Sequence, residues 1–128
     1  EEPLPPVDGN PSQLKQLFLN LIMNALEATA PGGAITVRLL GVERYGVPSL
    51  LAEVSDTGSG IPEPLLDKVF DPFVTTKARG TGLGLAICRG IADSHRATIR
   101  AENKRGGGGA TIAIEFPASS EAPVALHR

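Results

Sequence analysis

The sequence predicts a single α/β domain, because two segments have the apolar spacing of helices and two pairs of segments alternate like strands. A chain of 128 residues is long enough for one modest core. A hydrophobic content of 41% with 20% charged residues is typical of globular proteins. We expect the domain to cover residues 1–117 and residues 118–128 to form a disordered tail.

Composition narrows the classes of function. A net charge of −2 argues against a nucleic-acid-binding surface. The single cysteine, Cys88, rules out an internal disulfide and suits a reducing compartment. The sequence has no apolar run of transmembrane length and no signal peptide. We therefore expect a cytoplasmic domain without direct membrane contact. Because the first residue is Glu1 rather than Met, we expect it to be a piece of a longer protein, which is itself either soluble or membrane-anchored.

The first predicted helix begins after a proline-rich stretch in which residues 4–7 are expected to form a short edge strand. Asn10 is suited to cap the helix, Pro11 to its first position, and Gln13 to complete a capping box. The helix should end near Ala30, before Pro-Gly-Gly. Helical spacing gives it one apolar face: Leu14, Leu17, Phe18, Leu21, Ala25 and Ala28.

A polar stripe lies beside that apolar face. Asn20 and Asn24 are four residues apart, so their amides stack on neighbouring turns. A solvated helix surface would explain the stripe, but asparagine is a poor helix former, so the pair also indicates a ligand site. The full stripe is Gln13, Gln16, Asn20, Asn24 and Glu27.

A carboxylate followed by glycines ends the next predicted hairpin. Residues 35–39 and 49–55 are expected to pair as antiparallel strands around a loop at 41–48. Asp56-Thr57-Gly58-Ser59-Gly60 follows at the end of the second strand. The glycines allow a flat ligand to approach the backbone closely, and the carboxylate is able to accept a hydrogen bond from an amine such as that of adenine. An ordinary turn closing a strand is the alternative at this point.

The long connection over 57–81 has a length typical of a lid or binding loop. Within it, residues 62–69 are expected to form a short helix, and Phe70 and Phe73 to anchor the base of the lid in the core. A glycine-rich loop over 80–84 then opens a second helix with Leu83, Ile87, Gly90 and Ile91 on one face. Free N–H groups at such a helix start bind phosphate.

A second hairpin closes the predicted domain. Its alternating segments lie at 99–102 and 112–116. The glycine-rich turn between them, 104–109, is expected to be a flexible connection rather than a ligand-binding loop. His95, near the end of the second helix, is expected to be structural.

Four of these motifs, in this order, resemble the ATP-binding catalytic domain of sensor histidine kinases, in the superfamily of gyrase, heat-shock chaperone, histidine kinase and mismatch-repair ATPases. LFLNLIMNALEA is similar to the N box of that family, DTGSGIP to its G1 box, VFDPFVTTK to its F box and GTGLGLAI to its G2 box. The resemblance covers about residues 4–117. It implies a two-layer α/β sandwich in which a mixed, mostly antiparallel sheet packs against helices.

The resemblance also implies ATP and Mg²⁺ as cofactors. It implies that Asp56 binds the adenine amino group and that Asn24 binds the metal. Asn20 would face the phosphates, and Lys77, with Arg79, would contact the phosphate charge. The implied catalytic residues are Asn20, Asn24 and Lys77. The implied cofactor-binding residues are Asn20, Asn24, Glu27, Asp56, Gly58, Gly60, Ile61, Phe73, Thr76, Lys77, Gly80, Thr81, Gly82, Leu83, Gly84 and Leu85.

The activity implied is that of a protein-histidine kinase. Its partners would be a separate dimerisation domain that carries the phosphoacceptor histidine and, through the parent kinase, a response regulator; the isolated domain would be monomeric. The alternatives are a hydrolytic ATPase module, whose branches carry a glutamate where Asn20 stands, and a nucleotide-binding regulator without transfer. The sequence departs from the family at Arg96-Ala97, where Gly-Gly is usual, and at Asp71, where Glu is usual. It leaves open the signal and the cognate response regulator.

Overall fold

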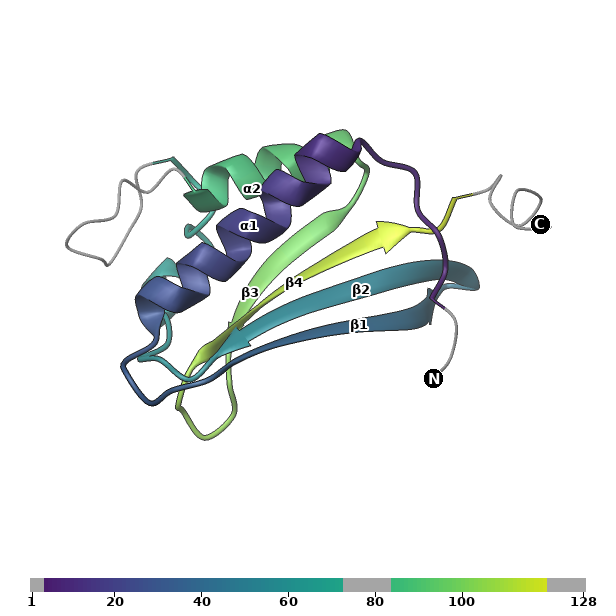
Figure 1. The fold of residues 1–128 in the computed structure, drawn as a ribbon. Coiled ribbons are helices and arrows are strands. Elements are labelled where there is room, and N and C mark those ends of the chain that lie inside the picture. The colour runs from purple at the N-terminus through teal and green to yellow at the C-terminus, as the bar shows by residue number, and fades with distance from the viewer. Residues whose placement is uncertain (1–3, 73–83, 120–128) are drawn as a thin grey trace.

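Two helices cover one face of a four-stranded antiparallel sheet in the computed structural model, which describes residues 4–72 and 84–119 (Figure 1). The sheet order is β1-β2-β4-β3, and each neighbouring pair is antiparallel. This arrangement confirms the predicted α/β sandwich. The helices are α1 (Pro11–Ala28) and α2 (Gly84–Ser94), and the strands are β1 (Ile35–Arg44), β2 (Val47–Asp56), β3 (Thr98–Asn103) and β4 (Ala110–Pro117).

Helix α1 begins as predicted but is capped differently. The Asn10 side chain accepts a hydrogen bond from the Gln13 amide at 3.1 Å. The backbone N–H of Asn10, which a capping box would give to Gln13, instead donates to Nε2 of His95 at 3.0 Å. The helix ends at Ala28, two residues before the predicted end. Leu17, Leu21 and Ala25 form its buried face, as expected.

The first hairpin is longer than predicted. Strand β1 continues to Arg44 and β2 begins at Val47, so the loop expected at 41–48 is wrong. The strands are joined at Tyr45 and Gly46, which both have positive φ, 53° and 78°. Two successive residues with positive φ make the turn that matches the twist of paired strands. Gly41 and Pro48, which bound the predicted loop, instead lie in the paired strands, opposite Leu50 and Glu43.

Two short predicted elements are also wrong. Residues 4–7 form no strand, because Pro5 and Pro6 have no N–H group to donate to a ladder. Instead of a helix over 62–69, the structure has one 3₁₀ turn, Glu63–Leu65, followed by further turns closed by bonds such as Lys68 N–H to the Leu65 carbonyl at 2.8 Å. Residues 62–69 contain two prolines and end beside the buried Phe70, so the segment is too short and too constrained for a regular α-helix.

The core lies between the sheet and the helices. Phe70 is 7% exposed, so it anchors the end of its segment as predicted, whereas Phe73 lies outside the described residues. Helix α2 buries Cys88, Ile91 and Ala92, while Ile87 is 40% exposed, so the predicted face was rotated by about one residue. Burial raises the pKa of the Cys88 thiol to about 12. Central core residues are Leu17, Leu21, Val54, Cys88, Ile114 and Phe116.

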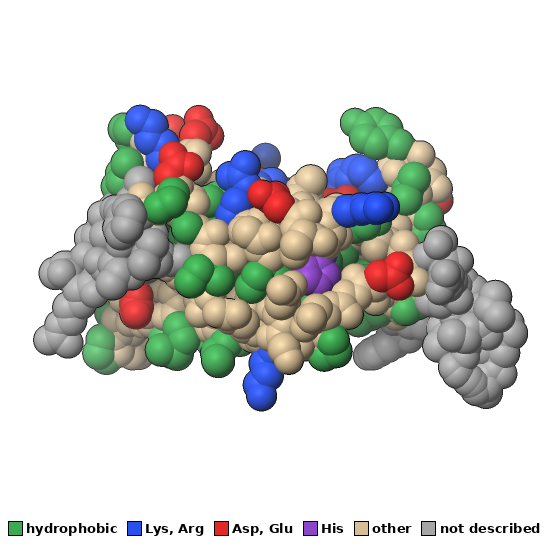
Figure 2. All heavy atoms as spheres, turned by 90° about the horizontal axis from the view of Figure 1, so that it is seen from above, with side chains coloured by type: hydrophobic (Ala, Val, Ile, Leu, Met, Phe, Trp, Pro, Cys, Tyr) green, Lys and Arg blue, Asp and Glu red, His purple; other side chains and the backbone are tan. Residues whose placement is uncertain are grey.

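The outer surface of the helical layer mixes hydrophobic and charged side chains (Figure 2). Leu19, Met23 and Leu26 follow one outward line along α1 and are 55%, 49% and 54% exposed. Within the described residues, no helix is long and apolar enough to span a membrane.

The end of the described chain is fastened to the N-terminal segment. The Ala118 N–H donates to the Pro48 carbonyl at 3.1 Å, and Ser119 donates to the Pro6 carbonyl and to the Asp8 carboxylate. Residues 120–128 lie outside the described residues, so the predicted tail stays a prediction.

Candidate functional site

Asp56 is a buried carboxylate at the last position of β2, with 5% of its surface exposed. Its Oδ1 accepts hydrogen bonds from the backbone N–H groups of Gly58 at 2.9 Å and Ala110 at 3.2 Å. Within the described residues, Oδ2 accepts no hydrogen bond. Two amides therefore hold the carboxylate in one orientation and leave its second oxygen as an acceptor for a ligand. An acceptor in this position suits the contact with an amine that was predicted for Asp56, and that contact stays a prediction.

The turn after Asp56 is fitted closely to the end of α1. A Cβ at Gly58 would lie 2.0 Å from the carbonyl oxygen of Ala28, so only glycine fits there. Thr57 accepts a hydrogen bond from the Ala34 N–H at 2.9 Å through its hydroxyl. The first contact joins the carboxylate turn to the helix that carries Asn20 and Asn24, and the second joins it to the segment between that helix and β1.

The second half of the turn is held from the other side. Gly60 has a φ of 84°, which favours glycine. Ile61 donates its N–H to Oδ1 of Asn103 at 2.7 Å, and its carbonyl accepts from Nδ2 of Asn103 at 2.7 Å. Its side chain packs against the core. No local sequence pattern indicates Asn103 or Ala110, because their partners in these bonds lie 42 and 54 positions away.

The glycine-rich turn between β3 and β4 was predicted to be only a flexible connection, and this prediction is wrong for Gly109. A Cβ at Gly109 would lie 1.9 Å from the carbonyl oxygen of Asp56. Cβ atoms at Gly106, Gly107 and Gly108 would meet no atom within 4 Å. Gly109 therefore lets the end of β2 pack directly against the start of β4.

The polar stripe of α1 contains an unsatisfied amide. Within the described residues, Nδ2 of Asn20 is buried and has no hydrogen-bond acceptor. A buried donor without an acceptor costs roughly 1–3 kcal/mol. Asn24 is partly buried and Glu27 is exposed on the same helix. An anionic oxygen beside Asn20 would satisfy the donor, which is consistent with the predicted phosphate contact.

The remaining predicted site residues lie at the start of α2 or before it. Gly84 is the first residue of α2, and Leu85 packs partly against the core. The end of β2, the C-terminal half of α1 and the start of α2 lie at the same end of the molecule, at the left of Figure 1. The predicted residues that lie outside the described residues are Phe73, Thr76, Lys77, Arg79, Gly80, Thr81, Gly82 and Leu83.

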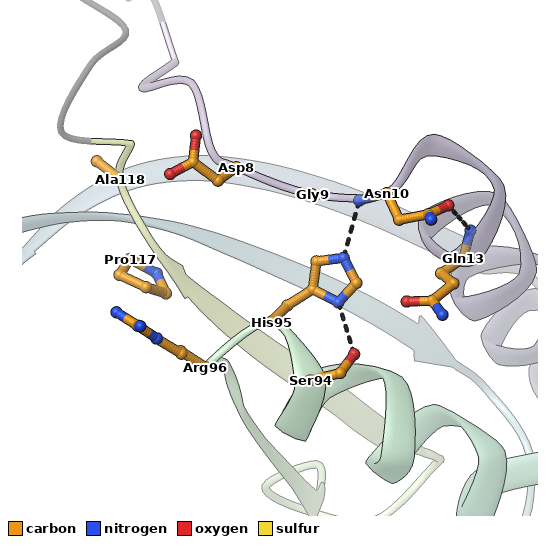
Figure 3. Close-up of a pocket in the computed structure, with 9 residues that line it drawn as sticks. All are labelled: Asp8, Gly9, Asn10, Gln13, Ser94, His95, Arg96, Pro117 and Ala118. Atoms are coloured by element: carbon orange, nitrogen blue, oxygen red, sulfur yellow. Dashed lines mark hydrogen bonds between the residues drawn. The ribbon is translucent and has the colours of Figure 1, made fainter.

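A separate pocket of about 610 Å³ lies at the opposite end, between the start of α1 and the end of α2 (Figure 3). His95 lies in it, and each of its ring nitrogens is used: Nε2 accepts from the Asn10 N–H, and Nδ1 lies 2.8 Å from the carbonyl of Ile91. Since Nε2 is an acceptor, the ring proton lies on Nδ1. The ring also meets Phe116 edge-on at 6.4 Å. These contacts confirm that His95 is structural.

The geometry agrees with comparisons to known proteins. Residues 9–120 match the family model described as histidine kinase-, DNA gyrase B- and HSP90-like ATPase. Sporulation kinase A of Bacillus subtilis is 39% identical over 111 residues, which are 87% of this chain and 18% of that kinase. The solved mycobacterial sensor histidine kinase MprB has a TM-score of 0.79 at 30% identity, covering 88% of this chain and 74% of that one. Histidine kinase ThkA, solved in complex with the response regulator TrrA, has a TM-score of 0.68 at 34% identity, covering 90% and 31%.

Proposed function

Because the chain belongs to the family of histidine kinase-, DNA gyrase B- and HSP90-like ATPases, and is a histidine-kinase-type ATP-binding domain, we propose that it binds Mg-ATP and supplies the γ-phosphoryl group to a histidine in a separate dimerisation domain. The observation that carries this proposal is Asp56, whose Oδ1 is held by two amides while Oδ2 is left as an acceptor. The exocyclic amine of adenine is a donor that suits this oxygen. Gly58 and Gly60 add no side chains to this turn, which supports a flat base lying against its backbone.

The described residues fit a triphosphate and its metal. The unsatisfied Nδ2 of Asn20 is a donor for a phosphate oxygen. Mg²⁺ binds oxygen ligands and retains several waters. The side-chain amide oxygen of Asn24, one turn further along α1, is therefore a suitable single protein ligand. The start of α2 at Gly84 adds the positive end of a helix dipole for phosphate. The metal supplies charge neutralisation of the phosphates when bound, and Asn20 and Asn24 orient them.

The chain carries no obvious base for hydrolysis at the position one turn before Asn24. Asn20 occupies it, and an amide does not accept a proton at neutral pH. Phosphoryl transfer depends mainly on positioning and charge stabilisation, and the nucleophile has to be oriented by a group nearby. We therefore assign the nucleophile to a histidine supplied by another domain, and the onward acceptor to a response regulator such as the one that ThkA binds.

The test is transfer in trans. The chain is incubated with ATP labelled at the γ-phosphate, alone and with a dimerisation domain that carries the histidine. Label should appear on that domain, slowly because the tether is lost, and neither on the chain nor as free phosphate at a useful rate. A dimerisation domain with His→Gln at the acceptor is the control.

Each alternative predicts a different result. Phosphate release by the chain alone, abolished by Asn20→Ala or Glu27→Ala, would favour the hydrolytic ATPase. Tight nucleotide binding without label on an intact acceptor domain would favour a nucleotide-binding regulator.

A further inference from the structure

The turn that carries Asp56 is fastened at both ends to one rung of the β3–β4 hairpin. Ala110 and Asn103 are direct partners in that ladder. Ala110 donates its backbone N–H to Asp56 at the start of the turn, at 3.2 Å. Asn103 binds the backbone of Ile61 at its end, through two bonds of 2.7 Å. The distance across one rung therefore sets the span of residues 56–61.

The bonds to Ile61 are made by a side chain that acts as a strand partner. The amide oxygen of Asn103 accepts from the Ile61 N–H, and its amide nitrogen donates to the Ile61 carbonyl. Both backbone polar groups of one residue, which belong to the peptide units on either side of it, are thus paired by one side chain. The contact is also tight, because a Cβ at Gly60 would lie 2.9 Å from Oδ1 of Asn103. Few other side chains have an acceptor and a donor at this spacing and length.

We propose that Asn103 is a positioning residue for recognition of the nucleotide base. It does not need to touch the base. It holds Ile61 and the peptide before it against the core, so that the turn presents a fixed wall opposite the Oδ2 atom of Asp56. This inference rests on the proposed function, and it predicts that loss of Asn103 loosens the turn and weakens selection of adenine over guanine.

The test compares Asn103→Ala with Thr111→Val. Thr111 lies on the next rung, and its hydroxyl is 2.8 Å from that of Ser55, so Thr111→Val removes a hydrogen bond from the same hairpin without touching residues 56–61. Amide hydrogen exchange of Ile61 and Val54, thermal unfolding, and the dissociation constants of ATP and GTP are measured for both variants and the parent.

The Ile61 amide should exchange about tenfold faster or more in Asn103→Ala, with little change at Val54. ATP should bind about tenfold more weakly, while GTP binding changes less, so that the dissociation constant of GTP divided by that of ATP falls. Thr111→Val should lower thermal stability and leave the ratio unchanged. Asn103→Asp, which retains an acceptor for the Ile61 N–H, should show Ile61 exchange between those of the parent and Asn103→Ala, and it replaces the alanine variant if that one does not fold.

Unchanged Ile61 exchange in either Asn103 variant would overturn the inference, whatever the nucleotide results. An ATP affinity within twofold of the parent, or an equal loss of ATP and GTP affinity matched by Thr111→Val, would reduce Asn103 to a structural residue. If the parent itself binds no nucleotide, the proposed function fails, and with it the role in base recognition, while the exchange data still decide whether Asn103 holds the turn.

Discussion

Replacing Asp56 with asparagine should separate base recognition from folding. The substitution is nearly isosteric. The amide oxygen of asparagine is able to accept the bonds that Oδ1 now accepts from Gly58 and Ala110 at 2.9 and 3.2 Å. The amide nitrogen then takes the position of Oδ2. The fold should be retained, because both backbone donors keep their acceptor.

The cost falls on the nucleotide. A donor replaces an acceptor at the adenine amine, so one hydrogen bond is lost and two donors face each other in a site where the residue is 5% exposed. Hydrogen bonds to charged groups contribute about 1.5–3 kcal/mol, and a desolvated unpaired donor costs a similar amount. A loss of about 2–3 kcal/mol corresponds to roughly 30- to 150-fold weaker ATP binding. The new donor also faces an acceptor if the base carries a carbonyl, so binding of inosine or guanine triphosphate should be weakened less.

Titration calorimetry of the parent and Asp56→Asn with ATP, ITP and GTP measures this directly. Thermal unfolding without nucleotide should differ by no more than about 2 °C, the effect of about half a kcal/mol in a domain of this size. An ATP affinity within twofold of the parent would refute the assignment of Asp56 to the base. A large loss of thermal stability would instead show that the carboxylate is needed by Gly58 and Ala110.

Three further outcomes are expected. Asn24→Ala should weaken ATP binding strongly with Mg²⁺ and little in EDTA; an equal loss in both conditions would remove Asn24 as a metal ligand. Arg96→Gly should raise the melting temperature by roughly 3–5 °C, because Arg96 has a φ of 60° where glycine costs less, and an unchanged or lower value would contradict that reading. Arg44, hydrogen-bonded to Glu115, holds the pKa of that carboxyl below its ordinary value of 4.5. The stabilisation is therefore present above pH 4.5 and lost as the pH falls through the lower pKa of the folded state, so the difference in melting temperature between the parent and Glu115→Gln should shrink on acidification.

Patterns among neighbouring residues predicted the helices and strands, but they did not predict the position of the turn that joins β1 to β2. The cap at Asn10, the buried face of α1 and the strand-end position of Asp56 follow from residues within a few positions of one another. The hairpin loop was predicted too long because Tyr45, which lacks the usual preference for positive φ, occupies the turn and gives no local signal for its position. Only the pairing of the whole strands decides where the turn lies.

The predicted site residues divide in the same way. The resemblance predicted Asn20, Asn24 and Asp56 as site residues, and the structure adds the buried amide of Asn20 that lacks an acceptor and the two backbone amides on Asp56. The resemblance did not indicate Asn103, because the hydrogen bonds of this residue depend on the register in which β3 pairs with β4.

The end of α2 shows how a departure from the family is absorbed. Arg96 donates its N–H to the Asp93 carbonyl at 3.1 Å, and Ala97 donates to the Ala92 carbonyl at 2.9 Å, which is the Schellman pattern of a helix C-terminus. That pattern requires a residue with positive φ, which explains why glycine is usual at position 96. Arginine is tolerated because neighbouring contacts hold the chain in place: Ala97 is 6% exposed, and His95 is bonded to both Ile91 and Asn10. Since the strain lies at the opposite end of the helix from Gly84, it should reduce stability and leave nucleotide affinity unchanged.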